Sequence, residues 1–72
     1  MELYSNKVNI AFDGINFALK LLEDINLNTT SLKDLINISY SYKILNNISN
    51  EDFKIFHYNY MSYILNKNYM TI

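Results

Sequence analysis

Hydrophobic residues recur at α-helical spacing in three segments of the chain. With 100° of rotation per residue counted from Val8, the first segment sorts into two apolar faces beside a polar one. The first face, which we expect to meet the core, contains Tyr4, Val8, Ala11, Phe12, Ile15, Ala18, Leu19 and Leu22. The second contains Leu3, Ile10, Gly14, Phe17 and Leu21. Together they cover a wider arc than the roughly 100° that one core-facing side needs.

Two polar stretches interrupt this pattern and contain signals for helix starts. "NLNTTS" ends in Ser31, and Asp34 follows three residues later, as at many helix N-termini. "NNISNED" offers Ser49 or Asn50 as a cap, with Glu51 and Asp52 in the first turn, where the helix dipole favours carboxylates. Proline is absent and glycine occurs once. The sequence therefore predicts one all-α domain over residues 1–72, a small three-helix bundle with helices at 3–25, 32–47 and 51–69.

The second predicted helix has two apolar rows. One row at helical spacing contains Leu35, Ile38, Tyr42 and Leu45, and a drifting row four residues apart contains Leu32, Ile36, Tyr40, Ile44 and Ile48. The stretch "NISYSYKI" also alternates enough to form a short strand. A helix and a strand both remain open for this stretch.

The third segment contains the aromatic stretch "FHYNYMSYIL". Strict alternation, which a strand requires, breaks at "MSYIL", whereas helical spacing sorts the segment into two faces. One face contains Phe53, Phe56, Tyr60, Tyr63 and Ile64, and the other contains Tyr58, Met61, Leu65, Tyr69 and Ile72. Aromatic side chains that stack on bases need a cationic groove beside them, and this helix has only Lys54 and Lys67. We expect these rings to serve core and interface packing.

The second apolar faces of the first and third helices predict self-association. A chain of 72 residues buries only about 60% of its unfolded surface when it folds alone. It has no cysteine for disulfides and one histidine, too few ligands for an ordinary zinc site. Gly14 would let a partner helix approach closely, although glycine costs roughly 1 kcal/mol of helix propensity. We expect a homodimer or larger assembly, with an interface at Leu3, Ile10, Gly14, Phe17, Leu21, Tyr58, Met61, Leu65 and Tyr69. The alternative is that both faces are buried within one chain.

The charges and the apolar runs argue against nucleic-acid and membrane partners. Six lysines, no arginine and seven acids give a net charge of −1, and no lysine cluster replaces the arginines that bind phosphate and guanine. No apolar run reaches the 18 residues of a membrane-spanning helix, and the first residues lack a signal-peptide pattern. We therefore expect a soluble cytoplasmic protein.

Residues with catalytic or metal-binding chemistry are few. His57 has no carboxylate one turn away on its own face, so we expect a structural or surface histidine. The pairs Glu23–Asp24 and Glu51–Asp52 each diverge by 100° on a helix and are expected to be solvated. No phosphate loop, metal motif or nucleophile signature is present. We expect no enzymatic activity, no cofactor and no metal.

Composition suggests a source and, through it, a role. Asn, Ile, Tyr, Lys, Phe and Met, which AT-rich codons encode, make up 42 of the 72 residues. A compact chain of this kind is typical of phages or mobile elements, and we expect it to bind a host protein as an inhibitor or modulator. A subunit of a larger particle is a further possibility, which would assemble in an open-ended way.

The alternative from another class is a helix-turn-helix DNA-binding regulator. In this interpretation "SLKDLINISYSYKILNNI" divides into two short helices around "SYS". Leu35, Tyr40, Leu45 and Ile48 would lie near the apolar positions of that motif, and Ser41 near its turn. The supposed recognition helix has one lysine, whereas DNA affinity depends largely on phosphate neutralisation.

Overall fold

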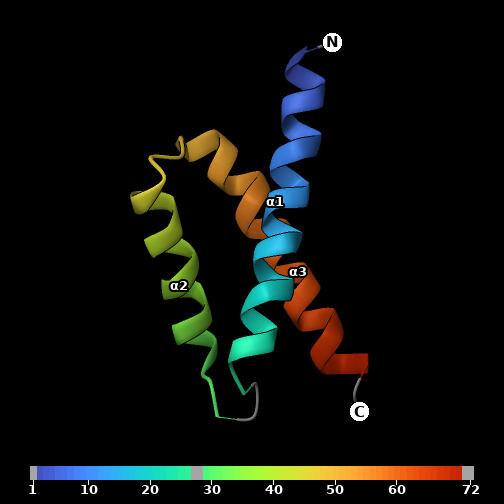
Figure 1. Cartoon of the computed structure of the whole chain (residues 1–72), viewed down its shortest axis with the longest axis vertical. Coiled ribbons are helices and arrows are strands. Elements are labelled where there is room, and N and C mark those ends of the chain that lie inside the picture. The colour runs from blue at the N-terminus through green and yellow to red at the C-terminus, as the bar shows by residue number, and fades with distance from the viewer. Residues whose placement is uncertain (1, 27–28, 71–72) are drawn as a thin grey trace.

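Three helices make up the fold. The computed structural model describes the backbone of residues 2–26 and 29–70 and the side chains of residues 7–26 and 29–67. The helices are α1 (Glu2–Asp24), α2 (Leu32–Leu45) and α3 (Asn50–Met70), and the described residues contain no strand (Figure 1). The predicted all-α class is confirmed, and the strand alternative for "NISYSYKI" is excluded because α2 runs unbroken through it.

Serine side chains cap α2 and α3, as the sequence predicts. Ser31 Oγ accepts a hydrogen bond of 3.1 Å from the Asp34 amide, and Ser49 Oγ accepts one of 3.2 Å from the Asp52 amide. Each bond satisfies a backbone donor that a helix N-terminus leaves without an intrahelical acceptor.

The end of α2 differs from its predicted position. The helix stops at Leu45, two residues early, because Asn47 adopts a left-handed conformation with φ of 52°. Asparagine tolerates this conformation better than most residues, and it commonly ends a helix. The amides of Asn47 and Ile48 bond back to the carbonyls of Ile44 and Lys43 at 3.3 and 3.1 Å.

Helices α1 and α3 cross (Figure 1), and their backbones approach closely at Gly14. A Cβ atom at this position would overlap the carbonyl oxygen of Phe56 and lie 3.2 Å from its carbonyl carbon. Gly14 itself is buried. The single glycine therefore serves a contact within the chain, because only a residue without a side chain lets the two backbones meet.

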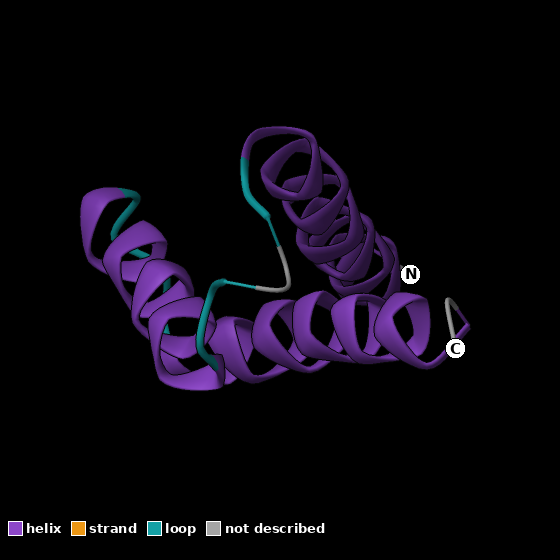
Figure 2. Ribbon diagram, turned by 90° about the horizontal axis from the view of Figure 1, so that it is seen from below, coloured by secondary structure: helices purple, strands orange, loops and turns teal. Residues whose placement is uncertain are grey.

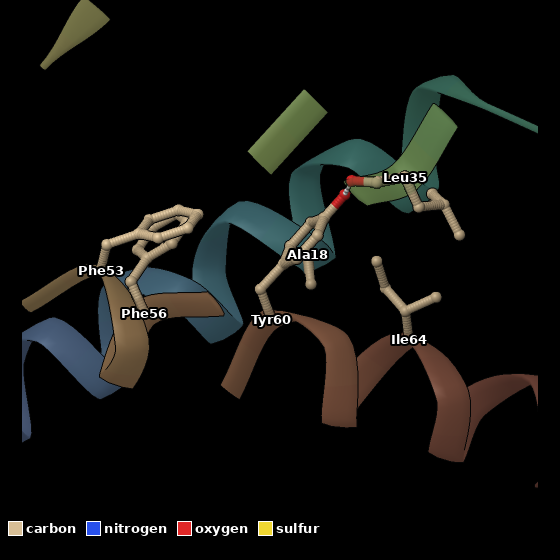
Figure 3. Close-up of a cluster of buried hydrophobic side chains, with 6 residues drawn as sticks. All are labelled: Ala18, Leu35, Phe53, Phe56, Tyr60 and Ile64. Atoms are coloured by element: carbon tan, nitrogen blue, oxygen red, sulfur yellow. Dashed lines mark hydrogen bonds between the residues drawn. The ribbon is translucent and has the colours of Figure 1, made fainter. Parts of the chain in front are cut away.

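The core is centred on one face of α3. Its buried apolar side chains come from all three helices (Figure 3) and are Ala18, Leu35, Phe53, Phe56, Tyr60 and Ile64. Four of these six lie on the first of the two faces predicted for the third helix, and Tyr63 packs against them. That prediction is confirmed.

The prediction of which α1 face meets the core is only partly right. Ile10, Phe17 and Leu21 pack against the core, whereas Val8, Phe12 and Leu19 are exposed. On the first face, however, Ala18 is buried, Leu22 packs against the core, and Ala11 and Ile15 are half-buried. Gly14 lies on the second face, so this face can approach α3 most closely. The side chains next to Gly14 on the same face are therefore directed toward the core.

Helix α2 is held to α3 mainly by side chains. The Tyr60 hydroxyl donates a buried hydrogen bond of 2.7 Å to the Leu35 carbonyl (Figure 3), and burial raises the pKa of Tyr60 to about 12, so the phenol stays protonated. Among the described residues, the backbone of α2 approaches that of α3 but not that of α1. Figure 2 shows α1 and α2 diverging from α3. The result is a bundle that is open between α1 and α2.

The helices can also be compared in length and hydrophobicity with a membrane-spanning segment. Among residues 2–26 and 29–70, no helix is both long enough and apolar enough to cross a membrane.

Candidate interaction surfaces

A stripe of apolar side chains follows the outward side of α1. We name it the outer face of α1 and define it by Val8, Phe12, Ile15 and Leu19. Phe12 is 58% exposed, Val8 and Leu19 are also exposed, and Ile15 is half-buried. The steps of four, three and four residues match the seam by which two helices pair in a coiled coil. The stripe with this helix-pairing spacing therefore faces solvent and not the core of the chain.

A cleft lies between α1 and α2. We name it the α1–α2 cleft; its volume is about 400 Å³ and it is partly open to solvent. It is lined by Asp13, Asn16, Phe17, Lys20 and Tyr42. The first four come from α1 and Tyr42 comes from α2, so the cleft follows directly from the separation of these helices.

Aromatic rings form the apolar part of the cleft. The ring centroids of Phe17 and Tyr42 are 4.6 Å apart. Tyr42 stacks on Phe56 at 4.7 Å with an angle of 8° between the ring planes, and Phe17 lies 5.7 Å from Phe56. These separations are typical of favourable aromatic pairs. Phe56 is buried and contacts both rings, so it holds Phe17 and Tyr42 in place.

Further apolar side chains are exposed on α2 and α3. On α2 these are Leu32, Tyr40, Ile44 and Leu45. Three of these four belong to the drifting row of the second helix, whereas the buried residues of α2 are Leu35 and Ser39. On α3, Tyr58 is 71% exposed and Leu65 is exposed as well.

The residues predicted for an interface divide into three groups. Ile10, Gly14, Phe17 and Leu21 face α3 or the core within the chain, and Met61 also packs against the core. Tyr58 and Leu65 are exposed. The side chains of Leu3 and Tyr69 lie outside the described residues. The described side chains in the α1 part of the predicted interface are therefore engaged within the chain and only partly exposed, whereas Val8, Phe12 and Leu19 on the outer face of α1 are exposed.

The placement of Phe17 changes what its substitution would test. If this stripe were a partner face, Phe17→Asp would dissolve an assembly and leave the helices intact. Phe17 instead contacts Tyr42, Phe56 and Tyr60, with ring centroids at 4.6 to 5.7 Å. An aspartate at this position would place a carboxylate among aromatic rings. We expect this change to destabilise the fold of the single chain.

His57 pairs with a buried serine, a contact that no local pattern in the sequence indicates. Its Nδ1 lies 2.7 Å from Ser39 Oγ, and Ser39 has no exposed surface. Either the Ser39 hydroxyl donates to Nδ1 or the Nδ1–H donates to Ser39 Oγ, according to which ring nitrogen of the neutral imidazole carries the proton. Burial lowers the pKa of His57 below its usual value, which favours that neutral form. The pair therefore ties α2 to α3.

We expect the stability of the fold to decline as the pH falls from 7.5 to 5. In this range the unfolded chain binds a proton at its histidine near pH 6.5, while the lowered pKa of folded His57 delays protonation. The unfolded state then holds more protons, so acid favours it. Urea unfolding midpoints across this range measure the effect, and His57→Gln should remove most of the slope. An equal slope in that variant would assign the pH dependence to other groups.

The same geometry bears on catalysis and on DNA binding. A serine beside a histidine has the atoms of an activated nucleophile, but Ser39 is fully buried and a substrate cannot reach its oxygen. Among the described residues, no three acidic, histidine or cysteine side chains gather as a metal site would require. The helix-turn-helix division around "SYS" is contradicted, because Ser41 lies inside the unbroken α2.

Comparisons with known proteins do not connect this chain to others. No protein-family model matches it, and searches of curated proteins and of solved structures found no significant similarity.

Proposed function

We propose that the protein acts by binding other proteins and that two copies associate through the outer face of α1. The observation that supports this proposal is the exposed stripe of Val8, Phe12, Ile15 and Leu19 at coiled-coil spacing. A second copy offers the same stripe, so a two-fold arrangement pairs identical surfaces.

The size of the outer face indicates a reversible association. Burying one large apolar side chain contributes about 1.5–3 kcal/mol. Association itself costs about 4–15 kcal/mol in lost freedom of motion. Four side chains from each copy, some of them already partly covered, offset this cost only modestly. The proposed dimer should therefore exchange with the monomer as concentration changes.

The proposal includes a second, different protein as the functional target. Tyr40, Ile44 and Tyr58 are exposed on α2 and α3 and are therefore available to contact such a protein. The proposed role is that of a modulator or inhibitor of a host protein in the cytoplasm, encoded by a phage or mobile element, in keeping with the AT-rich composition.

The association is tested by Phe12→Asp, which places a charge at the centre of the outer face. We expect the wild-type mass, measured by light scattering behind a sizing column, to rise over a hundredfold range of concentration. The Phe12→Asp variant should remain a monomer throughout, because pairing would bury its carboxylate.

The matched control is Asn9→Asp, which adds the same charge to an exposed polar position of α1. This variant should associate as the wild type does, and circular dichroism should show equal helix content in all three proteins. A Phe12→Asp variant that still associates would rule out the outer face of α1 as the interface.

A further inference from the structure

We infer that the α1–α2 cleft binds an aromatic side chain of a partner protein, in a segment that has a basic residue on one side of the ring and an acidic residue on the other. This inference rests on the proposed function, since it specifies the chemistry of a protein partner. It uses a different surface from the outer face of α1, so the two proposals can fail separately.

The cleft persists because of how α2 is held. The Tyr60–Leu35 and Ser39–His57 hydrogen bonds both join α2 to α3. Tyr42 extends from α2 and meets Phe17 of α1, but among the described residues the two helix backbones do not approach each other. The opening between them therefore belongs to the folded chain and does not require a ligand to form.

The cleft is large enough to admit an aromatic side chain, and its floor is aromatic. Its volume of about 400 Å³ falls within the range of roughly 300–1,000 Å³ that is common for ligand pockets. Phe17 and Tyr42 provide ring surfaces, and Phe56 holds both rings in place. A ring that enters meets partners already fixed in position, so little side-chain entropy is lost on binding.

Opposite charges lie at the two ends of the cleft. Asp13 and Lys20 are seven residues apart on α1, which corresponds to about 10 Å along the helix axis. In an extended chain the two residues that flank a central one lie about 7 Å apart, and the long side chains of a lysine and a glutamate cover the remaining distance. A segment with a central ring can therefore place a basic side chain near Asp13 and an acidic one near Lys20, and the Asn16 amide between them is available to its backbone.

The charge pattern favours a peptide segment of a different protein over the alternative occupants. The phosphates of a nucleic acid would meet the Asp13 carboxylate with like charge. Phe12 of a second copy is exposed, but its neighbours in the chain are Ala11 and Asp13, so it lacks the adjacent basic residue.

Capped tripeptides test the inference. The protein has no tryptophan, so the fluorescence of a peptide tryptophan reports binding without background from this residue. We expect acetyl-Lys-Trp-Glu-amide to give a saturable spectral shift, and acetyl-Lys-Ala-Glu-amide not to compete. Acetyl-Lys-Trp-Lys-amide and acetyl-Glu-Trp-Glu-amide should bind two- to fivefold more weakly, the range expected for the loss of one exposed ion pair.

A charge reversal at the rim makes the test specific. Lys20 is exposed, so Lys20→Glu should fold normally, and it should bind Lys-Trp-Lys more tightly than Lys-Trp-Glu. The inference is overturned if the tryptophan peptide does not bind saturably, if the alanine peptide competes equally, or if Lys20→Glu leaves the preference unchanged.

The Phe12→Asp variant separates this inference from the proposed self-association. If the cleft is the site, this variant binds Lys-Trp-Glu as the wild type does, although it no longer associates. Loss of peptide binding in Phe12→Asp would assign the peptide to the outer face of α1 and overturn the inference. A wild type that associates but binds no tryptophan peptide would leave only the self-association in place.

Discussion

Phe56→Ala should unfold the protein at room temperature or leave it only marginally folded. The side chain is 1% exposed and contacts the rings of Phe17, Tyr42 and Tyr60. Truncation of a buried phenylalanine costs about 3–5 kcal/mol. A domain of 72 residues has a total stability of roughly 4–10 kcal/mol. The loss is therefore comparable to the entire free energy of unfolding.

Urea unfolding followed by circular dichroism measures this effect, and Tyr58→Ala is the matched control. It removes a ring of similar size two residues away, but that ring is 71% exposed. Substitutions of this kind usually change stability by no more than about 0.5 kcal/mol. Similar unfolding midpoints for the two variants would contradict the assignment of Phe56 to the centre of the core.

Gly14→Ala is expected to destabilise the fold even though alanine is the better helix former. The exchange gains about 1 kcal/mol of helix propensity. The new methyl group, however, would overlap the carbonyl oxygen of Phe56, which belongs to a helix backbone and cannot rotate away as a flexible side chain would. Overpacking of this kind typically costs 1–3 kcal/mol and sometimes more, so we expect a net loss of about 2 kcal/mol. A larger residue, as in Gly14→Leu, should separate α1 from α3 altogether.

The control for Gly14→Ala is Asn9→Ala, an exposed position of the same helix. Here the gain in propensity, a few tenths to about 0.7 kcal/mol, meets no steric cost, and the variant should be slightly more stable than the wild type. If Gly14→Ala were also stabilising, the close crossing of α1 and α3 could not be correct.

The two substitutions bear on the candidate sites as well as on the core. Phe56 packs against the rings of Phe17 and Tyr42, and the absence of a side chain at Gly14 determines how closely α1 approaches α3. The α1–α2 cleft therefore depends on both positions, although neither lines it. Tests of the cleft are best made at exposed residues such as Lys20, where the fold is not at risk.

Local signals in the sequence determined the number of helices and their starts. Ser31 and Ser49 cap α2 and α3 through hydrogen bonds to residues three positions later, a contact that depends only on nearby sequence. The core face of α3 was also predictable, because its buried side chains follow helical spacing. The left-handed Asn47, by contrast, ended α2 earlier than its apolar pattern implied.

Only the tertiary structure decided which apolar face of α1 lies inside and which lies outside. Helical spacing reveals both faces but not the partner of either, since the choice depends on which face allows the closest packing against α3. Gly14 decides it, because the Phe56 carbonyl fits only where a side chain is absent. The Ser39–His57 bond and the α1–α2 cleft likewise join residues distant in the chain. The sequence alone thus determined the helices, and their packing decided which side chains are free to bind a partner.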